Sequence, residues 1–187
     1  MEHRIAYFDC FSGASGNMLL GALLDAGLPL EQLQADLDQL QIKGYSLRVA
    51  RQVRKGISGI HLDVDDELDS HPVRNLPLVR ELIGNSQLPE GIKSRSIAVF
   101  ERLARAEARI HGQDIDEIHF HEIGAVDTLV DIVGVIAGLE RLGVAHVYSS
   151  PLPTGGGTVT TQHGPLPVPA PATLALFAIS CTTPLRV

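Results

Sequence analysis

The stretch VDTLVDIVGVIAGLERL, residues 126–142, is apolar at most positions and has the length of a long helix. Apolar side chains point in nearly every direction around such a helix, which is typical of a helix buried on most sides. Asp127 and Asp131 are four residues apart and therefore share one face, which Gly134 and Gly138 continue. Each glycine costs about 1 kcal/mol relative to alanine within a helix. We therefore expect a buried central helix whose backbone is approached closely at the two glycines.

The two aspartates of this helix need different explanations. Asp127 lies in the first turn, where a carboxylate interacts favourably with the helix dipole by about 0.3–1 kcal/mol. Asp131 lies a full turn further in, where an ionised carboxylate costs several kcal/mol unless it is paired. One explanation is a salt bridge to the predicted helix 89–112, whose candidate partners are Arg102, Arg105 and Arg109. The other is a bound metal ion or ligand.

The rest of the sequence predicts strands and helices around this helix. An apolar strand ends near Cys10, and a Ser/Gly loop leads into a helix over 17–26. A helix over 31–42, a β-hairpin of 45–53 with 57–65, helices over 76–84 and 89–112 and a strand over 144–150 follow. Residues 151–172 are rich in proline and glycine and predict irregular structure before a short helix over 172–178. Together they predict one α/β domain over residues 1–187, with a mixed sheet that contains an antiparallel hairpin and is packed by several helices.

Composition narrows the classes of function. The chain has 187 residues, 44% of them hydrophobic, and a formal net charge of −7 without a run rich in Lys and Arg. This charge argues against nucleic acid or an anionic membrane as a partner. We see no signal peptide and no apolar run long enough for a membrane span, and two cysteines do not make a disulfide framework. The sequence therefore predicts a cytoplasmic, reduced protein.

Two histidines just before the central helix indicate a metal site. If residues 117–121 are extended, Glu117, His119 and His121 share one face, and Ile118 and Phe120 face the core. Two imidazoles in this arrangement can reach one metal ion, and nearby carboxylates can complete its coordination. The candidate metal ligands are His119, His121, Glu122, Asp127, Asp131 and Asp9, the last at the end of the first strand.

Two glycine-rich segments are candidates for holding a ligand. The segment FDCFSGASGNM, residues 8–18, places Ser12, Gly13, Ser15 and Gly16 ahead of a helix, where backbone N–H groups attract anions such as phosphate. Its spacing matches neither the P-loop nor the dinucleotide fingerprint, and Ser15 can equally be explained as an N-cap. In the second segment, Gly155, Gly156 and Gly157 let the backbone pass close to a ligand.

Four segments together resemble the LarC family of nickel-insertion proteins. They are FDCFSGASGNMLLGALLDAG (8–27), AEARIHG (106–112), IHFHEIGAVDTLVDIVG (118–134) and GGGTVTTQHGPLPVPAPAT (155–173). The family usually has Asp where this chain has Asn17, so one charged group is missing. The family's C-terminal region continues well beyond the end of this chain, so the resemblance implies the N-terminal portion of a longer protein.

The resemblance implies a function in cofactor assembly. Family members insert nickel into pyridinium-3,5-bisthiocarboxylic acid mononucleotide and so complete the nickel-pincer cofactor of lactate racemase, as nickel chelatases of the lyase class. CTP with Mg²⁺ or Mn²⁺ is attributed to the family's C-terminal region, so this chain is expected to need that region for activity. The implied partners are the mononucleotide precursor, lactate racemase or a C-terminal companion chain, and a second copy in a homo-oligomer.

The resemblance and the residues combine into one hypothesis. His119 and His121, with carboxylates such as Glu122, hold Ni²⁺, and the loop from Ser12 to Gly16 holds the phosphate of the mononucleotide. Asp131 accepts the proton that the ring carbon loses when it is metallated. The alternatives are a non-catalytic nickel metallochaperone and a metal-dependent phosphoester hydrolase.

Overall fold

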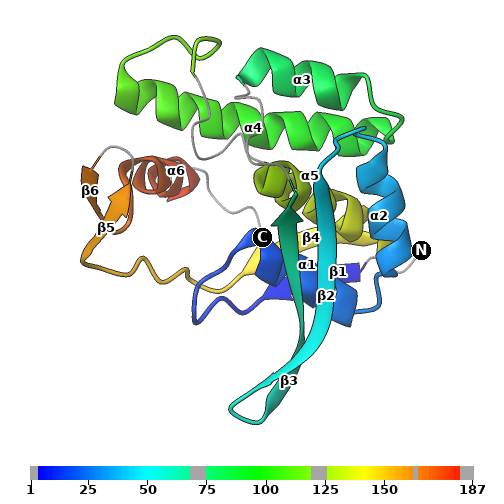
Figure 1. Ribbon diagram of the computed structural model, residues 1–187. Helices are drawn as coiled ribbons and strands as arrows, with labels where there is room; N and C mark the ends of the chain where they lie inside the picture. The colour runs from blue at the N-terminus through cyan, green and yellow to red at the C-terminus, as the bar shows by residue number, and fades with distance from the viewer. Residues whose placement is uncertain (1–3, 68–74, 119–125, 162–163, 182–187) are drawn as a thin grey trace.

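The computed structural model describes residues 4–67, 75–118, 126–161 and 164–181. Their secondary structure contains both strands and helices, with the longer helices α4 and α5 in the middle of the chain (Figure 1). In chain order the elements are β1 (Arg4–Phe8), α1 (Gly16–Asp25), α2 (Leu30–Asp38), β2 (Tyr45–Arg54), β3 (Ile57–Asp66), α3 (Leu76–Gly84), α4 (Glu90–His111), α5 (Val126–Arg141), β4 (Val144–Ser149), β5 (Thr158–Thr161), β6 (Gly164–Pro167) and α6 (Pro171–Cys181).

Helix α5 is the centre of the fold, as its apolar sequence predicts. It packs against α1, α2, α4, β3 and β4, and its buried residues belong to the one core cluster found among the described residues. The close approach expected at its glycines is also confirmed. A methyl carbon added at Gly138 would lie 2.9 Å from Leu28 and 3.0 Å from Leu23, and one added at Gly134 would lie 3.0 Å from Leu20. The leucines of α1 and of the turn after it therefore pack directly on the α5 backbone.

The described strands form three two-stranded sheets. β1 and β4 are parallel, with Tyr7 opposite Tyr148, and lie side by side behind α1 in Figure 1. β2 and β3 form the predicted antiparallel hairpin, and β5 and β6 form a second, shorter one. The predicted fold class, α/β with an antiparallel hairpin and several packed helices, is confirmed, and the parallel and antiparallel pairs are separate sheets.

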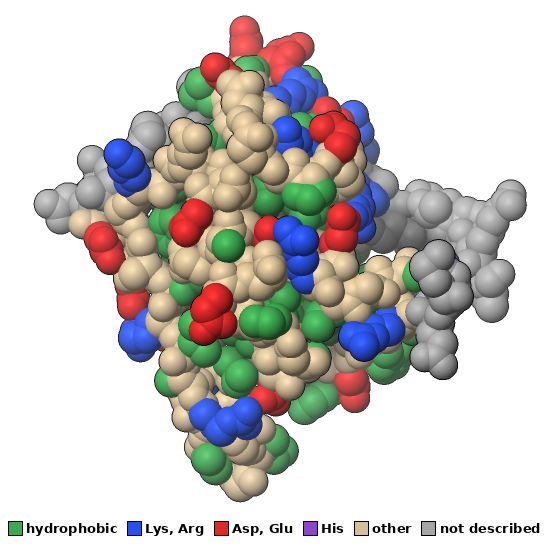
Figure 2. Space-filling view, turned by 90° about the vertical axis from the view of Figure 1, so that its right-hand side faces the viewer, with side chains coloured by type: hydrophobic (Ala, Val, Ile, Leu, Met, Phe, Trp, Pro, Cys, Tyr) green, Lys and Arg blue, Asp and Glu red, His purple; other side chains and the backbone are tan. Residues whose placement is uncertain are grey.

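The long β2–β3 hairpin contacts the core through β3, which packs mainly against α1 and also against α5. Leu62 of β3 is fully buried, and Gly21 of α1 lies so close to β3 that an added methyl carbon would be 2.5 Å from the carbonyl oxygen of Ile60. Lys55 and Gly56 both have positive φ angles, as the two central residues of a type I′ hairpin turn require. The turn projects below the rest of the molecule and carries hydrophobic and basic side chains (Figures 1 and 2).

The segment 151–172 is more regular than its composition predicts. β5 and β6 lie within it, so the expectation of purely irregular structure is wrong. Pro165 and Pro167 pair with Thr160 and Thr158 in a sheet of only two strands. Both strands are edge strands, where a proline nitrogen, which has no N–H to donate, can face away from the partner strand. Helix α6 begins at Pro171, a favourable residue for a first helical position, and extends beyond the predicted end at residue 178.

The surface of the molecule shows no strong bias of charge on the face drawn in Figure 2. Acidic and basic side chains alternate there, with hydrophobic side chains between them. In the part of the chain that the structure describes, no helix has the length and hydrophobicity of a membrane span.

An ion pair joins α5 to α2 and gives a first prediction. Arg141 donates to both carboxylate oxygens of Asp36, at 2.6 and 3.0 Å, and the Asp36 side chain is only 5% exposed. Arg141→Ala leaves this carboxylate without its partner, so we expect the free energy of unfolding to fall by about 1–2 kcal/mol, less than for a fully buried pair because Arg141 is partly exposed. Urea unfolding measures the loss. Arg54→Ala, at the exposed hairpin tip, serves as control, and equal stability of the two variants would contradict a structural role for the pair.

Candidate functional site

The carboxyl ends of the parallel strands β1 and β4 meet the Ser/Gly loop. The backbone N–H of Cys10 donates to the Ser150 hydroxyl at 2.8 Å, and the N–H of Ser150 donates to the carbonyl of Phe8 at 2.9 Å. Ligands of α/β proteins bind outside the carboxyl ends of parallel strands. Ser150 therefore helps to build this end of the sheet, and its position at the end of a predicted strand was the only sequence signal for that role.

The Ser/Gly loop leads into the N-terminus of α1. Ser15 has an extended backbone, and its hydroxyl accepts a hydrogen bond from the N–H of Met18 at 3.3 Å, so the N-cap explanation for Ser15 is confirmed. Gly13 has a φ angle of 95° and donates its N–H to the carbonyl of Cys10 at 2.9 Å, which closes a turn. The side chains of Ser12 and Ser15 are exposed. The loop is thus an ordered, open surface at a helix N-terminus.

Asp131 of α5 lies directly against the start of α1. A methyl carbon added at Gly16 would be 2.0 Å from the Asp131 carboxyl carbon and from its Oδ2. Only glycine at position 16 therefore leaves room for this carboxylate. The sequence marks both residues as candidates, but it does not indicate that they touch, because they are far apart in the chain.

The Asp131 carboxylate is half-buried and poorly satisfied. Its Oδ1 atom is buried and has no hydrogen-bond partner. Burial, and secondly the negative charge of Asp127, raise the pKa of Asp131 from 3.8 to about 6. A carboxylate with such a pKa can exchange a proton near neutral pH.

The salt bridge proposed as an alternative for Asp131 is not present among the described residues. Arg105 pairs instead with Glu101 on its own helix at 3.3 Å, and no described arginine forms an ion pair with Asp131. Asp127 is exposed, and its carboxylate accepts a hydrogen bond from the N–H of Thr128 at 2.6 Å within the first turn of α5. The local role expected for Asp127 is therefore sufficient to explain it, whereas no described residue forms an ion pair with Asp131 and its Oδ1 atom has no hydrogen-bond partner.

The remaining candidates next to this loop have simpler environments. Asp9 is exposed directly after β1. Cys10 is buried and points its thiol toward the carbonyl of Phe8, with a sulfur–oxygen distance of 3.6 Å. Cys10 thus behaves as a small buried side chain, while Asp9 is open to an incoming ligand.

The glycine-rich segment 155–157 has a conformational explanation within its own hairpin. Gly155 and Gly157 have φ angles of 73° and 93°, and the carbonyl of Gly157 accepts a hydrogen bond from the N–H of Val168 at 3.0 Å. Gly156 is exposed, and a methyl carbon added there would meet no atom within 4 Å, so packing does not require glycine at this position. A role of these glycines in ligand binding stays a prediction.

His119, His121 and Glu122 lie outside the described residues, and the chain just before them is firmly held. Ile118 is 2% exposed, as expected for an anchor in the core. Glu117, predicted to be extended, instead belongs to a turn in which its N–H donates to the carbonyl of Asp114 at 3.2 Å. Glu117 therefore does not share an extended face with the two histidines, and that part of the prediction is wrong.

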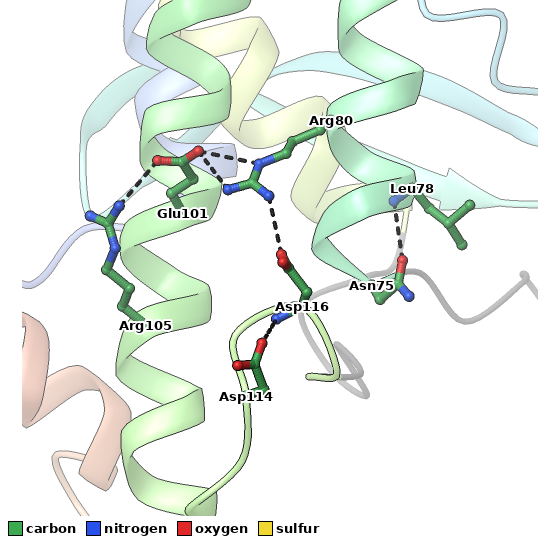
Figure 3. A network of polar contacts seen from close by, with 7 residues as sticks. All are labelled: Asn75, Leu78, Arg80, Glu101, Arg105, Asp114 and Asp116. Atoms are coloured by element: carbon green, nitrogen blue, oxygen red, sulfur yellow. Dashed lines mark hydrogen bonds and ion pairs between the residues drawn. The ribbon is translucent and has the colours of Figure 1, made fainter.

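A polar network fixes this turn to the two neighbouring helices (Figure 3). Arg80 of α3 pairs with Glu101 of α4 at 2.8 Å and with Asp116 of the turn at 3.1 Å. Asp114 accepts a hydrogen bond from the N–H of Asp116 at 2.9 Å. Within the described ranges alone, no group of three or more His, Cys, Asp or Glu side chains is arranged to hold a metal ion.

Comparison with known proteins adds independent information. A family model described as nickel insertion protein matches residues 6–185. A relative from Roseiflexus castenholzii is 51% identical over 175 residues, which cover 94% of this chain and 44% of that protein. A pyridinium-3,5-bisthiocarboxylic acid mononucleotide nickel insertion protein from Desulfitobacterium hafniense is 51% identical over 174 residues, which cover 93% of this chain and 43% of that protein. The chain thus spans less than half the length of these relatives, and no solved structure matches it significantly.

Proposed function

The chain belongs to the nickel insertion protein family, and from this premise we propose that it takes part in inserting nickel into pyridinium-3,5-bisthiocarboxylic acid mononucleotide. The activity named for the Desulfitobacterium relative belongs to a protein more than twice as long, so its transfer to this chain is our proposal. The observation that carries it is the half-buried Asp131 side chain against Gly16, whose Oδ1 atom has no hydrogen-bond partner, at the loop that follows β1.

Asp131 is proposed as the base of the reaction. When nickel bonds to the pyridinium ring carbon, that carbon loses a proton, and a nearby carboxylate with a pKa of about 6 can accept it at neutral pH. Its Oδ1 atom has no partner that would have to be displaced first. Burial also excludes part of the surrounding water, so an incoming cation gains more from this carboxylate than from an exposed one.

The Ser/Gly loop is proposed to hold the phosphate of the mononucleotide. It lies at the N-terminus of α1, where the helix dipole attracts an anion, and the exposed Ser12 hydroxyl can donate a further hydrogen bond. Gly13 and Gly16 keep bulky side chains out of this position, and Gly16 also brings Asp131 beside it. One site can thus bind the phosphate and take up the proton.

Nickel is the substrate ion of this proposal. The ligands that we propose for it are His119, His121 and Glu122, with Asp131, Asp127 and Asp9 as further oxygen donors. Imidazole and carboxylate suit Ni²⁺ and release it more readily than a closed thiolate site. We assign Gly155, Gly156 and Gly157 to contacts with the organic part of the substrate.

The finer assignments follow from the family and are also proposals. They comprise a lyase-class chelatase activity, transfer of the product to lactate racemase and a cytoplasmic location. They also include a dependence on CTP with Mg²⁺ or Mn²⁺, which would act through the part of the longer relatives outside the matched region. They are proposals because this chain covers only 43% of the Desulfitobacterium relative.

Calorimetry with nickel and the mononucleotide precursor tests the proposed function. We expect nickel to bind more tightly when the precursor is present. We also expect the mixture to activate apo lactate racemase once CTP and the unmatched part of the Desulfitobacterium relative are added. A nickel affinity that is the same with and without the precursor would instead indicate a metallochaperone. Hydrolysis of simple phosphoesters with Mg²⁺ or Mn²⁺ and no nickel would indicate a phosphoesterase.

The ligand assignment gives a second prediction. His119→Ala combined with His121→Ala removes both proposed imidazole ligands, so nickel affinity should fall at least tenfold in calorimetry. His61→Ala is the matched control, because His61 of β3 already pairs with Asp63 at 3.1 Å. Unchanged nickel affinity in the double variant would remove these histidines from the site.

A further inference from the structure

The parallel pair β1–β4 is an incomplete sheet. Parallel sheets in α/β proteins are normally covered on both faces. Here Ile5 and Tyr7 of β1 are 63% and 65% exposed, and Tyr148, directly opposite Tyr7, is 45% exposed. Side chains opposite each other in the register point to the same side, and Ile5 and Tyr7 are two residues apart, so these three lie on one largely apolar face, together with the exposed His146 opposite Ile5. We call Ile5, Tyr7 and Tyr148 the open face.

A groove runs along β1 beside this face. It has a volume of about 400 Å³ and is lined by all five residues of β1, by Ala22, Leu23 and Ala26 at α1, and by Leu142 and Val144. The part of α1 next to β1 thus contributes two alanines, whose side chains leave space above the helix. β4 pairs along one edge of β1, and among the described residues no strand pairs along the other.

A free strand edge next to an apolar groove is suited to an added strand. Main-chain hydrogen bonds to β1 would supply affinity, and alternate side chains of the added strand would enter the space over the alanines. A soluble protein rarely leaves such an edge and such an apolar face uncovered. Other exposed apolar residues, such as Ile57 at the hairpin turn, do not adjoin this groove.

We propose that this groove and the open face bind the part of the longer family members that lies outside the region matched here, through a β-strand added to β1. More than half of the length of both relatives lies outside the matched region, because the match covers only 43–44% of them. A polypeptide of that size can provide both the strand and the apolar surface that covers Tyr7. The interaction concerns assembly and does not depend on nickel or on the site at Asp131.

Cysteine labelling tests this proposal. Tyr7→Cys and the control Ile57→Cys, each made together with Cys181→Ser, should react rapidly with a maleimide in this chain alone, since both positions are exposed. The chain is then co-expressed with the unmatched part of the Desulfitobacterium relative, and the two are purified together. In the complex Tyr7→Cys should react at least tenfold more slowly, while Ile57→Cys should react as before. If the added part is insoluble by itself, joining it to this chain through a flexible linker gives the same readout.

A second pair of variants tests the groove itself. Ala22→Arg places a long side chain in the groove and should weaken the complex at least tenfold, whereas Ser94→Arg, on an exposed position of α4, should not. The proposal is overturned if no complex forms, if Tyr7→Cys stays equally reactive in it, or if Ala22→Arg binds normally. It is also overturned if Tyr7→Cys is protected in this chain alone and more so at higher concentration, because the occupant is then a second copy.

Discussion

Asp131→Asn is expected to reduce nickel insertion by at least a hundredfold while making the protein more stable at neutral pH. Asparagine keeps the size of the side chain beside Gly16 but can neither accept the ring proton nor donate a charged oxygen to nickel. Loss of a general base commonly costs a factor of a hundred or more. Lower activity together with higher stability would show that the carboxylate is kept for function.

The gain in stability depends on pH in a defined direction. Folding raises the pKa of Asp131 from 3.8 to about 6, so the folded protein binds the proton more tightly than the unfolded chain. The ionised carboxylate therefore lowers the free energy of unfolding. This loss is complete above about pH 6, decreases as the pH falls, and is absent below about pH 4. The shift corresponds to about 3 kcal/mol at full strength, which we reduce to about 1–2 kcal/mol because the side chain is partly exposed to solvent.

Urea unfolding at several pH values measures this effect. Asp131→Asn should exceed the wild-type free energy of unfolding by about 1–2 kcal/mol at pH 8, and the difference should vanish as the pH falls toward about 4. Asp9→Asn is the control, because Asp9 is exposed and its charge is not among the causes of the raised pKa of Asp131. A stability gain that is the same at every pH, or a loss at pH 8, would contradict the assigned environment of Asp131.

Gly21→Ala is expected to destabilise the fold by about 2–3 kcal/mol. The added methyl carbon would lie 2.5 Å from the carbonyl oxygen of Ile60, and a backbone atom in a paired strand cannot move away as a flexible side chain can. Either α1 must shift from its place against α5, or β3 must leave α1. Both changes disturb the core around Leu20 and Leu62.

Gly84→Ala is the control for this substitution. Gly84 is the last residue of α3, and an added methyl carbon would meet no atom within 4 Å. Because alanine is favoured over glycine in a helix, this variant should be as stable as the wild type or slightly more stable. Thermal and urea unfolding compare the two variants, and similar stability of both would show that the contact between Gly21 and β3 is not tight.

The sequence by itself determined the local structure. The apolar run of α5, the alternating pattern of β2 and β3, and Gly112 at the end of α4 are local signals, and the helices and strands that they predict are present. The hairpin of β5 and β6 was missed because its prolines argue against strands, a signal that does not apply at the edge of a two-stranded sheet.

The site illustrates what only the tertiary structure decided. Composition and position singled out Asp131, Gly16 and the Ser/Gly loop as separate features, and the burial expected for Asp131 followed from its apolar neighbours in the sequence. That Asp131 lies against Gly16, that no described arginine pairs with it, and that Ser150 holds the loop to β4 depend on packing between distant segments. Helix and strand periodicity specify which face of an element is buried, whereas its partner is selected by how side chains from the whole chain fit together in three dimensions.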